Sequence, residues 1–364
     1  MPTSASRSKV ITVRRPQALV SYWQSGELYI ENYLTASCAR ASPLVMGVLE
    51  AASDYVTQAQ LTRAFDGVPD VPSLVAQLLH VDFLVERGSV KDKADRALDK
   101  GWAWGPAARF FHYRTQSVPY EEDLDKQRAS IVALARERRP PSPYKEYRSR
   151  PTKLPAADGE GEFWSVLRKR RSRRQFGSAP LPLLDFARIL GWTWGSTAQV
   201  EHKDLGAYLL KTSPSGGACH PIEVYPVVLN VEGVDPGIYH YSVRKHALSL
   251  LRAGDFQALC RDMLAKQPWA GEAAAAFLMT AVVERSMWKY RHDHAYRVLL
   301  LDAGHLGQTL HLVCTKLGVS VVTSSAKDDR LIEEVLGIDG ISEISVYSAA
   351  VGITDGGTRI VSRG

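Results

Sequence analysis

In the first quarter of the chain, apolar positions follow a strand-like spacing and then a helical one. Residues 18–23 and 27–32 have the composition of short strands, joined by a turn at Gln24-Ser25-Gly26. Three segments with apolar residues at helical spacing follow, and a predicted strand over 83–87 ends at Gly88. The helices are expected to begin at Ser42-Pro43, at the capping box Thr57-x-x-Gln60, and near Pro72. The pattern therefore predicts a hairpin, three helices and a strand, in that order.

This order of elements predicts a winged-helix-like module over residues 10–90. Winged helices often bind DNA, but the third predicted helix has no Lys or Arg between Val71 and His80. Because DNA binding draws most of its affinity from neutralised phosphates, we expect no nucleic acid partner. A strand edge in such a module can instead take up a peptide as an added strand. We therefore expect a peptide-binding or scaffolding role.

The rest of the chain divides into a predicted connector, 91–160, and a larger domain, 161–355. The connector ends in a stretch rich in Pro, Arg, Ser and Lys, which is typical of exposed, extended chain. In the larger domain, a very apolar run over 274–284 predicts a central strand, and 296–317 a long helix. Further helices are expected at 163–169, 183–190 and 255–265, and further strands at 224–231, 237–241, 247–251 and 344–351. Because helices and strands do not alternate strictly, we expect an α+β domain with a mixed sheet and packed helices.

Composition gives expectations about membrane association, cellular location and metal binding. The chain has 364 residues, of which 45% are hydrophobic, and no apolar run is long enough to span a bilayer, so we expect no membrane partner. Residues 1–15 lack the apolar core of a signal peptide. The four cysteines are scattered and form no metal-binding pair, which favours a reduced, cytoplasmic protein without a structural metal. The net charge of +6 is mild, but part of the excess is concentrated in one place.

That place is the segment from Arg168 to Arg174, where six of seven residues are basic. Such a density of like charges is repulsive unless an anion lies among them. Arginine binds phosphate with two parallel hydrogen bonds, and Ser172 adds a hydroxyl donor. The alternative is a solvated basic turn, and the segment by itself does not decide between the two.

A second candidate is the loop Pro214-Ser215-Gly216-Gly217, which precedes a predicted strand. Small residues let the backbone approach a flat ring closely and leave N–H groups free to donate. Taken alone, the loop is better explained as an ordinary turn. The chain has neither a GxGxxG nor a GxxxxGKS sequence, so no Rossmann or P-loop nucleotide site is expected.

Taken together and in order, these segments resemble a known family. Arg170-Arg171-Ser172-x-Arg174-x-Phe176 resembles the phosphate-binding opening of the nitroreductase superfamily. The sequence from Pro214 to Tyr225 is similar to the flavin loop of its SagB-type branch, the dehydrogenases of thiazole/oxazole-modified peptides. Residues 237–241 and 302–308 are similar to that branch as well, so the resemblance extends from about 163 to 352.

The resemblance implies a nitroreductase-like α+β fold that forms a homodimer and binds FMN at the subunit interface. It implies that the phosphate and ribityl end of FMN contacts Arg170, Ser172 and Arg174, with Arg171 a weaker match. Pro214, Ser215, Gly216 and Gly217 match the loop that lies against the flavin ring. Family members also use a basic residue after the last strand; here Arg359 is displaced from that place, so this contact is left open.

The dipeptide Lys289-Tyr290 points to a reaction. In peptide azoline dehydrogenases, a Lys-Tyr pair in this region is associated with catalysis, whereas ordinary nitroreductases do not need one. Oxidising a thiazoline or oxazoline removes a proton from Cα and a hydride, which flavin N5 accepts, so the protein must supply a base. The alternative is a surface pair in a basic loop that also contains Arg285 and Arg291.

The leading hypothesis is therefore an FMN-dependent enzyme that oxidises azolines to azoles in a ribosomally made precursor peptide. Lys289 and Tyr290 would be its base and proton-transfer pair, and a cyclodehydratase complex would be a possible partner. One alternative is an NAD(P)H-dependent nitroreductase or quinone reductase. Another is a scaffold or docking subunit of a peptide-modifying complex, without activity of its own. A DNA-binding regulator with a flavin sensor is disfavoured by the missing basic residues in the third predicted helix.

Overall fold

The computed structural model describes residues 10–116, 121–138, 140–145, 152–155, 157, 159–203 and 206–354. By their contacts these residues form two compact units, each described below by itself. The first comprises residues up to Gln116 together with Met287–Tyr296, and the second comprises Ser117–Ser286 and the chain from Arg297 onward. The short segment Met287–Tyr296 thus belongs with the N-terminal unit, although it lies far along the chain.

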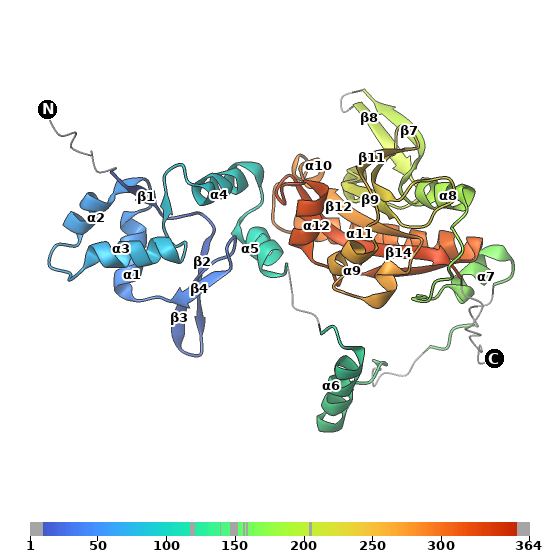
Figure 1. Cartoon of the computed structure of the whole chain (residues 1–364), viewed down its shortest axis with the longest axis horizontal. Coiled ribbons are helices and arrows are strands. Elements are labelled where there is room, and N and C mark those ends of the chain that lie inside the picture. Colours follow the sequence, from blue (N-terminus) through green and yellow to red (C-terminus); the bar gives the residue numbers. More distant parts are fainter. Residues whose placement is uncertain are drawn as a thin grey trace. The chain divides into compact units, whose positions relative to one another are not determined.

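The N-terminal unit begins with strands and continues with helices (Figure 1). Two small antiparallel sheets have the orders β5-β1-β6 and β2-β3-β4. The elements are β1 (Thr12–Arg14), β2 (Leu19–Gln24), β3 (Glu27–Asn32), β4 (Ser37–Arg40), α1 (Pro43–Ala51), β5 (Val56–Thr57), α2 (Gln58–Ala64), α3 (Val71–His80), β6 (Val85–Glu86), α4 (Val90–Gly101) and α5 (Pro106–Arg114). The predicted hairpin, three helices and strand are confirmed; the winged-helix assignment itself stays a prediction.

Local capping signals explain where these helices begin. The Ser42 side chain accepts a hydrogen bond from Val45 N, and Pro43 occupies the first turn of α1. Thr57 and Gln60 form the reciprocal capping box of α2, as the sequence predicts. Buried apolar side chains of α1, α2 and α3 pack against Val13 and Ile30 of the strands to form one core.

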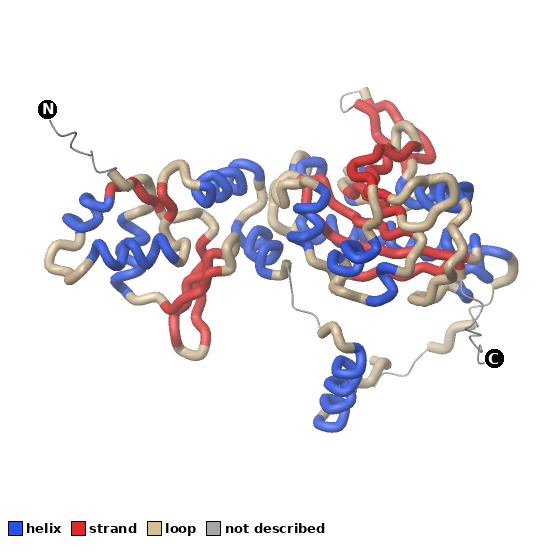
Figure 2. Tube along the Cα trace, viewed as in Figure 1, coloured by secondary structure: helices blue, strands red, loops and turns tan. Residues whose placement is uncertain are grey.

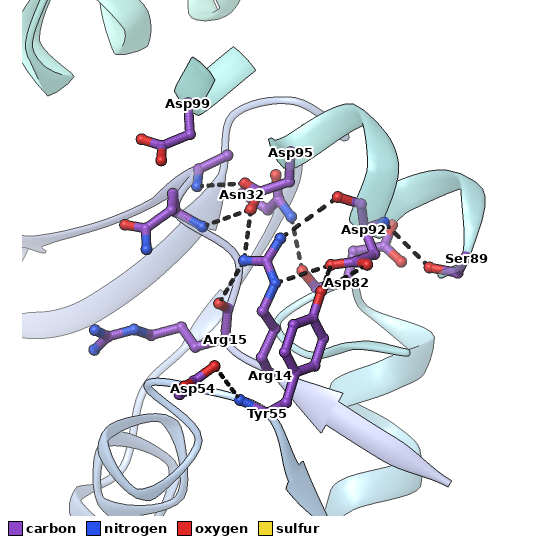
Figure 3. A network of polar contacts seen from close by, with 12 residues as sticks. Arg14, Arg15, Asn32, Asp54, Tyr55, Asp82, Ser89, Asp92, Asp95 and Asp99 are labelled. Carbon is purple, nitrogen blue, oxygen red and sulfur yellow. Dashed lines mark hydrogen bonds and ion pairs between the residues drawn. The ribbon is translucent and has the colours of Figure 1, made fainter. Parts of the chain in front are cut away.

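Helix α4 is attached to this core by charge (Figure 3). Its buried face presents Asp92 and Asp95, which both form ion pairs with the buried Arg14 at 2.8 Å. Asp95 also accepts the backbone N–H groups of Gln17 and Ala18, just before β2. Burial opposes ionisation of Asp92, but hydrogen bonds from Tyr55, the backbone of Gly88 and Arg14 outweigh it and lower its pKa. Asp92 and Asp95 therefore fix α4 to Arg14 at the end of β1, and Asp95 also fixes it to the backbone just before β2.

The second unit is built on a six-stranded sheet of order β11-β10-β9-β12-β14-β13, with helices on both faces (Figures 1 and 2). Every neighbouring pair of these strands is antiparallel, so the expectation of a mixed sheet is wrong in this respect. The strands are β7 (Ser196–His202), β8 (Gly206–Lys211), β9 (Ile222–Val228), β10 (Gly237–Ser242), β11 (Ala247–Ala253), β12 (Ala275–Val282), β13 (Val319–Ser324) and β14 (Glu343–Ile353). The helices are α6 (Leu124–Glu137), α7 (Glu162–Lys169), α8 (Leu183–Trp194), α9 (Gln257–Met263), α10 (Glu284–Met287), α11 (Ala295–Leu317) and α12 (Asp329–Leu336), with 3-10 turns η1 (Gly216–Ala218) and η2 (Pro268–Gly271).

The central strand β12 explains how the layers are held. Its side chains alternate between the two faces, as they must in any strand. Leu278 lies in the core that includes Cys260 of α9 and Ile332 of α12. Phe277 points to the other face, where it packs against Phe186 and Trp194 of α8. The predicted α+β class with a sheet and packed helices is confirmed.

Candidate functional site

The glycine loop after β8 lies along α11 and is held there by a buried carboxylate. Asp302 of α11 is 3% exposed and accepts both the Ser215 hydroxyl, at 2.5 Å, and the Gly216 N–H, at 3.1 Å. Ser215 Oγ in turn accepts His220 N at 2.9 Å, which closes the loop on itself. His305 Nδ1 lies 3.2 Å from the carbonyl oxygen of Pro214. Residues of the 302–308 motif therefore contact the glycine loop directly.

Two glycines meet different demands in this loop. Gly217 has φ of 63°, in the left-handed region that favours glycine. Gly216 is constrained by space, because a Cβ there would lie 2.3 Å from Cγ1 of Val298 on α11. The loop thus approaches the helix more closely than any larger residue at 216 allows.

The basic segment after α7 runs beside β13 in an extended form. The backbone N–H of Arg173 donates to the carbonyl oxygen of Val321 at 2.8 Å. Arg171 and Arg173 line a cavity whose lining does not include Arg170, Ser172 or Arg174. None of these three side chains makes a hydrogen bond or ion pair with any residue that the structure describes. Two cations and a hydroxyl with uncommitted donors suit the phosphate of FMN.

Arg170 also affects a neighbour on α11. His311 is buried, and its pKa falls to about 4, first because burial disfavours the charged imidazolium and second because of the Arg170 charge. His311 therefore stays neutral beside this arginine at neutral pH, and adds no competing charge.

Arg171 makes contacts of its own within the segment. Its guanidinium donates to the carbonyl oxygens of Arg168 and Arg170, at 2.9 and 2.7 Å. With Arg168, Lys169 and Arg173 it lines an open cavity of about 410 Å³ beside the end of α11. These contacts distinguish Arg171 from Arg170, Ser172 and Arg174, the three residues that match the family's phosphate contacts best.

A charged cluster that the sequence analysis did not find lies behind the loop. Burial lowers the pKa of Lys211, with Glu223 opposing and Arg285 adding to the effect. Burial also lowers the pKa of His220, and the neighbouring Lys211 charge lowers it further. Glu223 pairs with both Arg285, at 2.5 Å, and His240, at 2.8 Å. These residues come from strands and turns that are distant in sequence, so no local motif reveals them.

The Lys289-Tyr290 pair lies in the first unit, whereas the loop and the basic segment lie in the second. The Lys289 ammonium is 5.7 Å from the centre of the Tyr290 ring, so the two side chains are neighbours. Lys289 is exposed and Tyr290 is half-buried. Arg359 lies outside the described residues, so its predicted role stays open.

Comparisons with known proteins identify the family to which these segments belong. The model of the nitroreductase family matches residues 167–353, which include the basic segment, the loop and α11. The chain belongs to the nitroreductase family. A protein of Methanocaldococcus jannaschii whose name describes a nitroreductase is 34% identical over 48% of this chain and 83% of its own length. The predicted membership of this superfamily is thereby confirmed.

Two other relatives are named for peptide processing. The trifolitoxin-processing protein TfxB of Rhizobium leguminosarum bv. trifolii is 34% identical over 48% of this chain. The microcin B17-processing protein McbC of Escherichia coli is 28% identical over 35% of this chain. The chain spans about half the length of each of these two proteins, 48% in both cases.

Among the residues that the structure describes, no group of three or more His, Cys, Asp or Glu side chains is placed to hold a metal ion. Within the same residues, no helix is both long and apolar enough to cross a bilayer.

Proposed function

We propose that this protein is an FMN-dependent dehydrogenase that oxidises azoline rings in a ribosomally made peptide. The observation that supports a flavin site most directly is the row of uncommitted donors on Arg170, Ser172 and Arg174. The peptide substrate is supported by similarity to two proteins named for processing trifolitoxin and microcin B17.

In this proposal, Arg170, Ser172 and Arg174 hold the phosphate end of FMN, and the loop 214–217 lies against its ring. Arginine and hydroxyl donors match phosphate oxygens, and the close-packed glycines leave a flat surface for the ring. Bound FMN supplies a two-electron acceptor that dioxygen can reoxidise. A Cβ at 216 would lie 2.3 Å from Cγ1 of Val298, so a larger residue there would displace the loop from α11 or move Val298.

In this proposal, residues of the chain itself accept and transfer the proton. Azoline oxidation removes one hydride and one proton from the ring, and the amine of Lys289 takes the proton from Cα. Tyr290, whose ring is next to the Lys289 ammonium, passes the proton on through its hydroxyl. The contact that supports this pairing is the 5.7 Å distance from the Lys289 ammonium to the centre of the Tyr290 ring.

The N-terminal unit would hold the peptide by strand addition along β2. Within the described residues β2 pairs with β3 alone. A groove of about 290 Å³ is lined by Leu19, Val20 and Ser21 of β2, by Ile30 of β3, by Met46, Leu49 and Glu50 of α1, and by Arg15, Pro16 and Gln17. An unpaired strand edge, with a groove of mixed polar and apolar lining that also contacts β2, suits an extended peptide.

The hairpin register supplies a specific variant. Gln24 pairs with Glu27 across the two-residue turn, so Ser21 is at a position whose N–H points away from β3. Ser21→Pro should therefore weaken binding of a full precursor peptide, seen as a higher KM. Its kcat with a short thiazoline peptide should not change.

A homodimer is the expected assembly, as the family resemblance implies. In the second unit, exposed apolar side chains gather on α8 and α11, which favours burial against another copy. They are Leu183, Leu184, Trp192, Leu300 and Leu301. Light scattering should give twice the chain mass.

The decisive test is spectroscopic. Purified protein should contain bound flavin, and mixing it anaerobically with a synthetic peptide that contains one thiazoline ring should bleach the flavin absorbance. The product should be lighter by two hydrogen atoms. Lys289→Ala should lower kcat on the order of 10²- to 10⁴-fold, as expected for a lost general base. Lys93→Ala, on the exposed side of α4, is the matched control. Colourless protein that FMN does not reconstitute would exclude the proposal.

Family membership favours one other function, an NAD(P)H-dependent nitroreductase or quinone reductase. That enzyme predicts rapid bleaching of the flavin by NADPH, with no effect of Lys289→Ala or Tyr290→Phe. If both variants retain full activity on every substrate tested, this alternative replaces the dehydrogenase.

A further inference from the structure

The segment Met287–Tyr296 is fixed to the N-terminal unit at three places, spaced three residues apart. The carbonyl oxygen of Tyr290 accepts the indole N–H of Trp104 at 2.9 Å. The carboxylate of Asp293 accepts the backbone N–H of Gly105. The hydroxyl of Tyr296 lies 2.9 Å from Nδ1 of His112. Trp104 and Gly105 come from the corner between α4 and α5, and His112 comes from α5 itself.

The first attachment is the one closest to the Lys289-Tyr290 pair. Trp104 is fully buried, and its ring packs edge-on against Trp102 and Tyr296, with ring centres 5.5 and 5.9 Å apart. Its N–H therefore points in a fixed direction. Because it binds the backbone of Tyr290 itself, it fixes the peptide plane that follows the proposed catalytic tyrosine.

The second attachment leaves little room for a side chain at position 105. Gly105 is the N-cap residue of α5, and no side chain of its own caps the helix. The carboxylate of Asp293 occupies that role, at the end of the helix where the dipole favours negative charge. A Cβ at 105 would lie 3.0 and 3.1 Å from the two carboxylate oxygens, so a side chain there would push Asp293 away.

We propose that Trp104 and Gly105 are positioning residues for catalysis, because they hold the Lys289-Tyr290 pair in its working conformation. This inference rests on the proposed function, since it takes Lys289 and Tyr290 as the proton-transfer pair. It adds a second role to the N-terminal unit, which both binds the peptide and fixes the geometry of the catalytic segment. Neither Trp104 nor Gly105 needs to touch the substrate for this role.

The same corner is tied to the proposed peptide groove. Helix α4 leads into Trp102 and Trp104, and its Asp95 holds the backbone at Gln17 and Ala18, next to β2. The strand that would receive the peptide is thus attached to α4, and the segment with the catalytic pair is attached to residues that follow α4 in the chain. Peptide binding and proton transfer would share one rigid support.

Trp104→Phe tests the inference, because it removes the N–H donor and keeps the ring. Trp269→Phe is the matched control, since the indole N–H of that buried tryptophan donates to Gln267 at 3.0 Å in the second unit. With a synthetic thiazoline peptide as the probe, Trp104→Phe should lower kcat on the order of 10- to 100-fold, and KM should stay within about twofold. Gly105→Ala should have the same effect, and Trp269→Phe should have neither.

A second measurement does not depend on catalysis. Lys289 and Arg291 are exposed trypsin sites within the segment. In the full chain without peptide, Trp104→Phe and Gly105→Ala should speed cleavage after both residues several-fold, as read by mass spectrometry, whereas Trp269→Phe should not. Unchanged cleavage, or faster cleavage with unchanged kcat, would overturn the inference.

The Lys289→Ala and Trp104→Phe experiments distinguish the proposed function from the proposed positioning role. If Lys289→Ala is fully active, the proposed function fails, whatever Trp104→Phe does. If Lys289→Ala is inactive and Trp104→Phe has a normal kcat, the proposed function stands and the positioning role is wrong.

Discussion

Removing the Asp302 carboxylate should weaken flavin binding by a predictable amount. Asp302 is the buried acceptor of two hydrogen bonds that hold the glycine loop, from the Ser215 hydroxyl and the Gly216 N–H. Hydrogen bonds to an ionised group contribute about 1.5 to 3 kcal/mol each. In Asp302→Ala both are lost, and water replaces them in part, so ordering the loop should cost roughly 3 kcal/mol. If FMN binds only the ordered loop, this cost appears in its dissociation constant, which should rise about 100-fold, at 1.4 kcal/mol per tenfold.

The assay is titration of the apoprotein with FMN, followed by quenching of flavin fluorescence. Asp302→Asn is the graded variant, because it keeps one acceptor oxygen, and it should raise the dissociation constant about 10-fold, for roughly half of that free energy. Circular dichroism should show both variants folded. An alanine variant that is folded and binds FMN within about threefold of the parent would refute the argument that this carboxylate organises the site.

Three further predictions follow from other parts of the structure. Gly216→Ala should weaken FMN binding because its Cβ meets Val298, and Val298→Ala should restore binding in the double variant, as measured by the same titration. Arg14→Met should lower the free energy of unfolding by about 3 to 5 kcal/mol in urea, since it strands two buried carboxylates, whereas Arg15→Met, at an exposed ion pair, should cost less than about 1 kcal/mol. The pKa of His311 is about 4 in the folded chain and 6.5 in the unfolded chain, so the unfolded chain takes up the proton first as the pH is lowered. The free energy of unfolding should therefore decrease as the pH is lowered from 6.5 to 4, and it should decrease less steeply in His311→Gln.

The elements that the sequence predicts well are those specified by neighbouring residues. The caps of α1 and α2 depend on residues three positions apart, so their first turns can be located from Ser42, Thr57 and Gln60. The apolar run of β12 and the long helix α11 are also close to their predicted bounds. The ordered motifs of the second unit identify the family, because the loop and the 302–308 motif contact one another directly.

The elements that the sequence did not predict depend on distant partners. Helix α4 lies in the segment that the sequence analysis assigns to a connector. Its buried positions are Asp92, Asp95 and Leu98, and because two of these three are carboxylates, the segment shows no helical repeat of apolar residues. They are buried because Arg14 meets them, which no local pattern shows. The exposed hairpin β7–β8 was missed for lack of a regular alternation, and the cluster around Glu223 because its members converge only in the fold.

The attachment of Met287–Tyr296 to the first unit has a consequence for how the protein is made. Translation delivers the strands and helices up to Gln116 early, but the partner of the Trp104 indole and the carboxylate that caps α5 come much later. The N-terminal unit is therefore incomplete until the ribosome has passed residue 296. For the same reason, transplanting this unit onto a related enzyme needs two splices, one after Gln116 and one around Met287–Tyr296. A chimera made with a single junction would leave Trp104 and Gly105 facing a loop from a different protein.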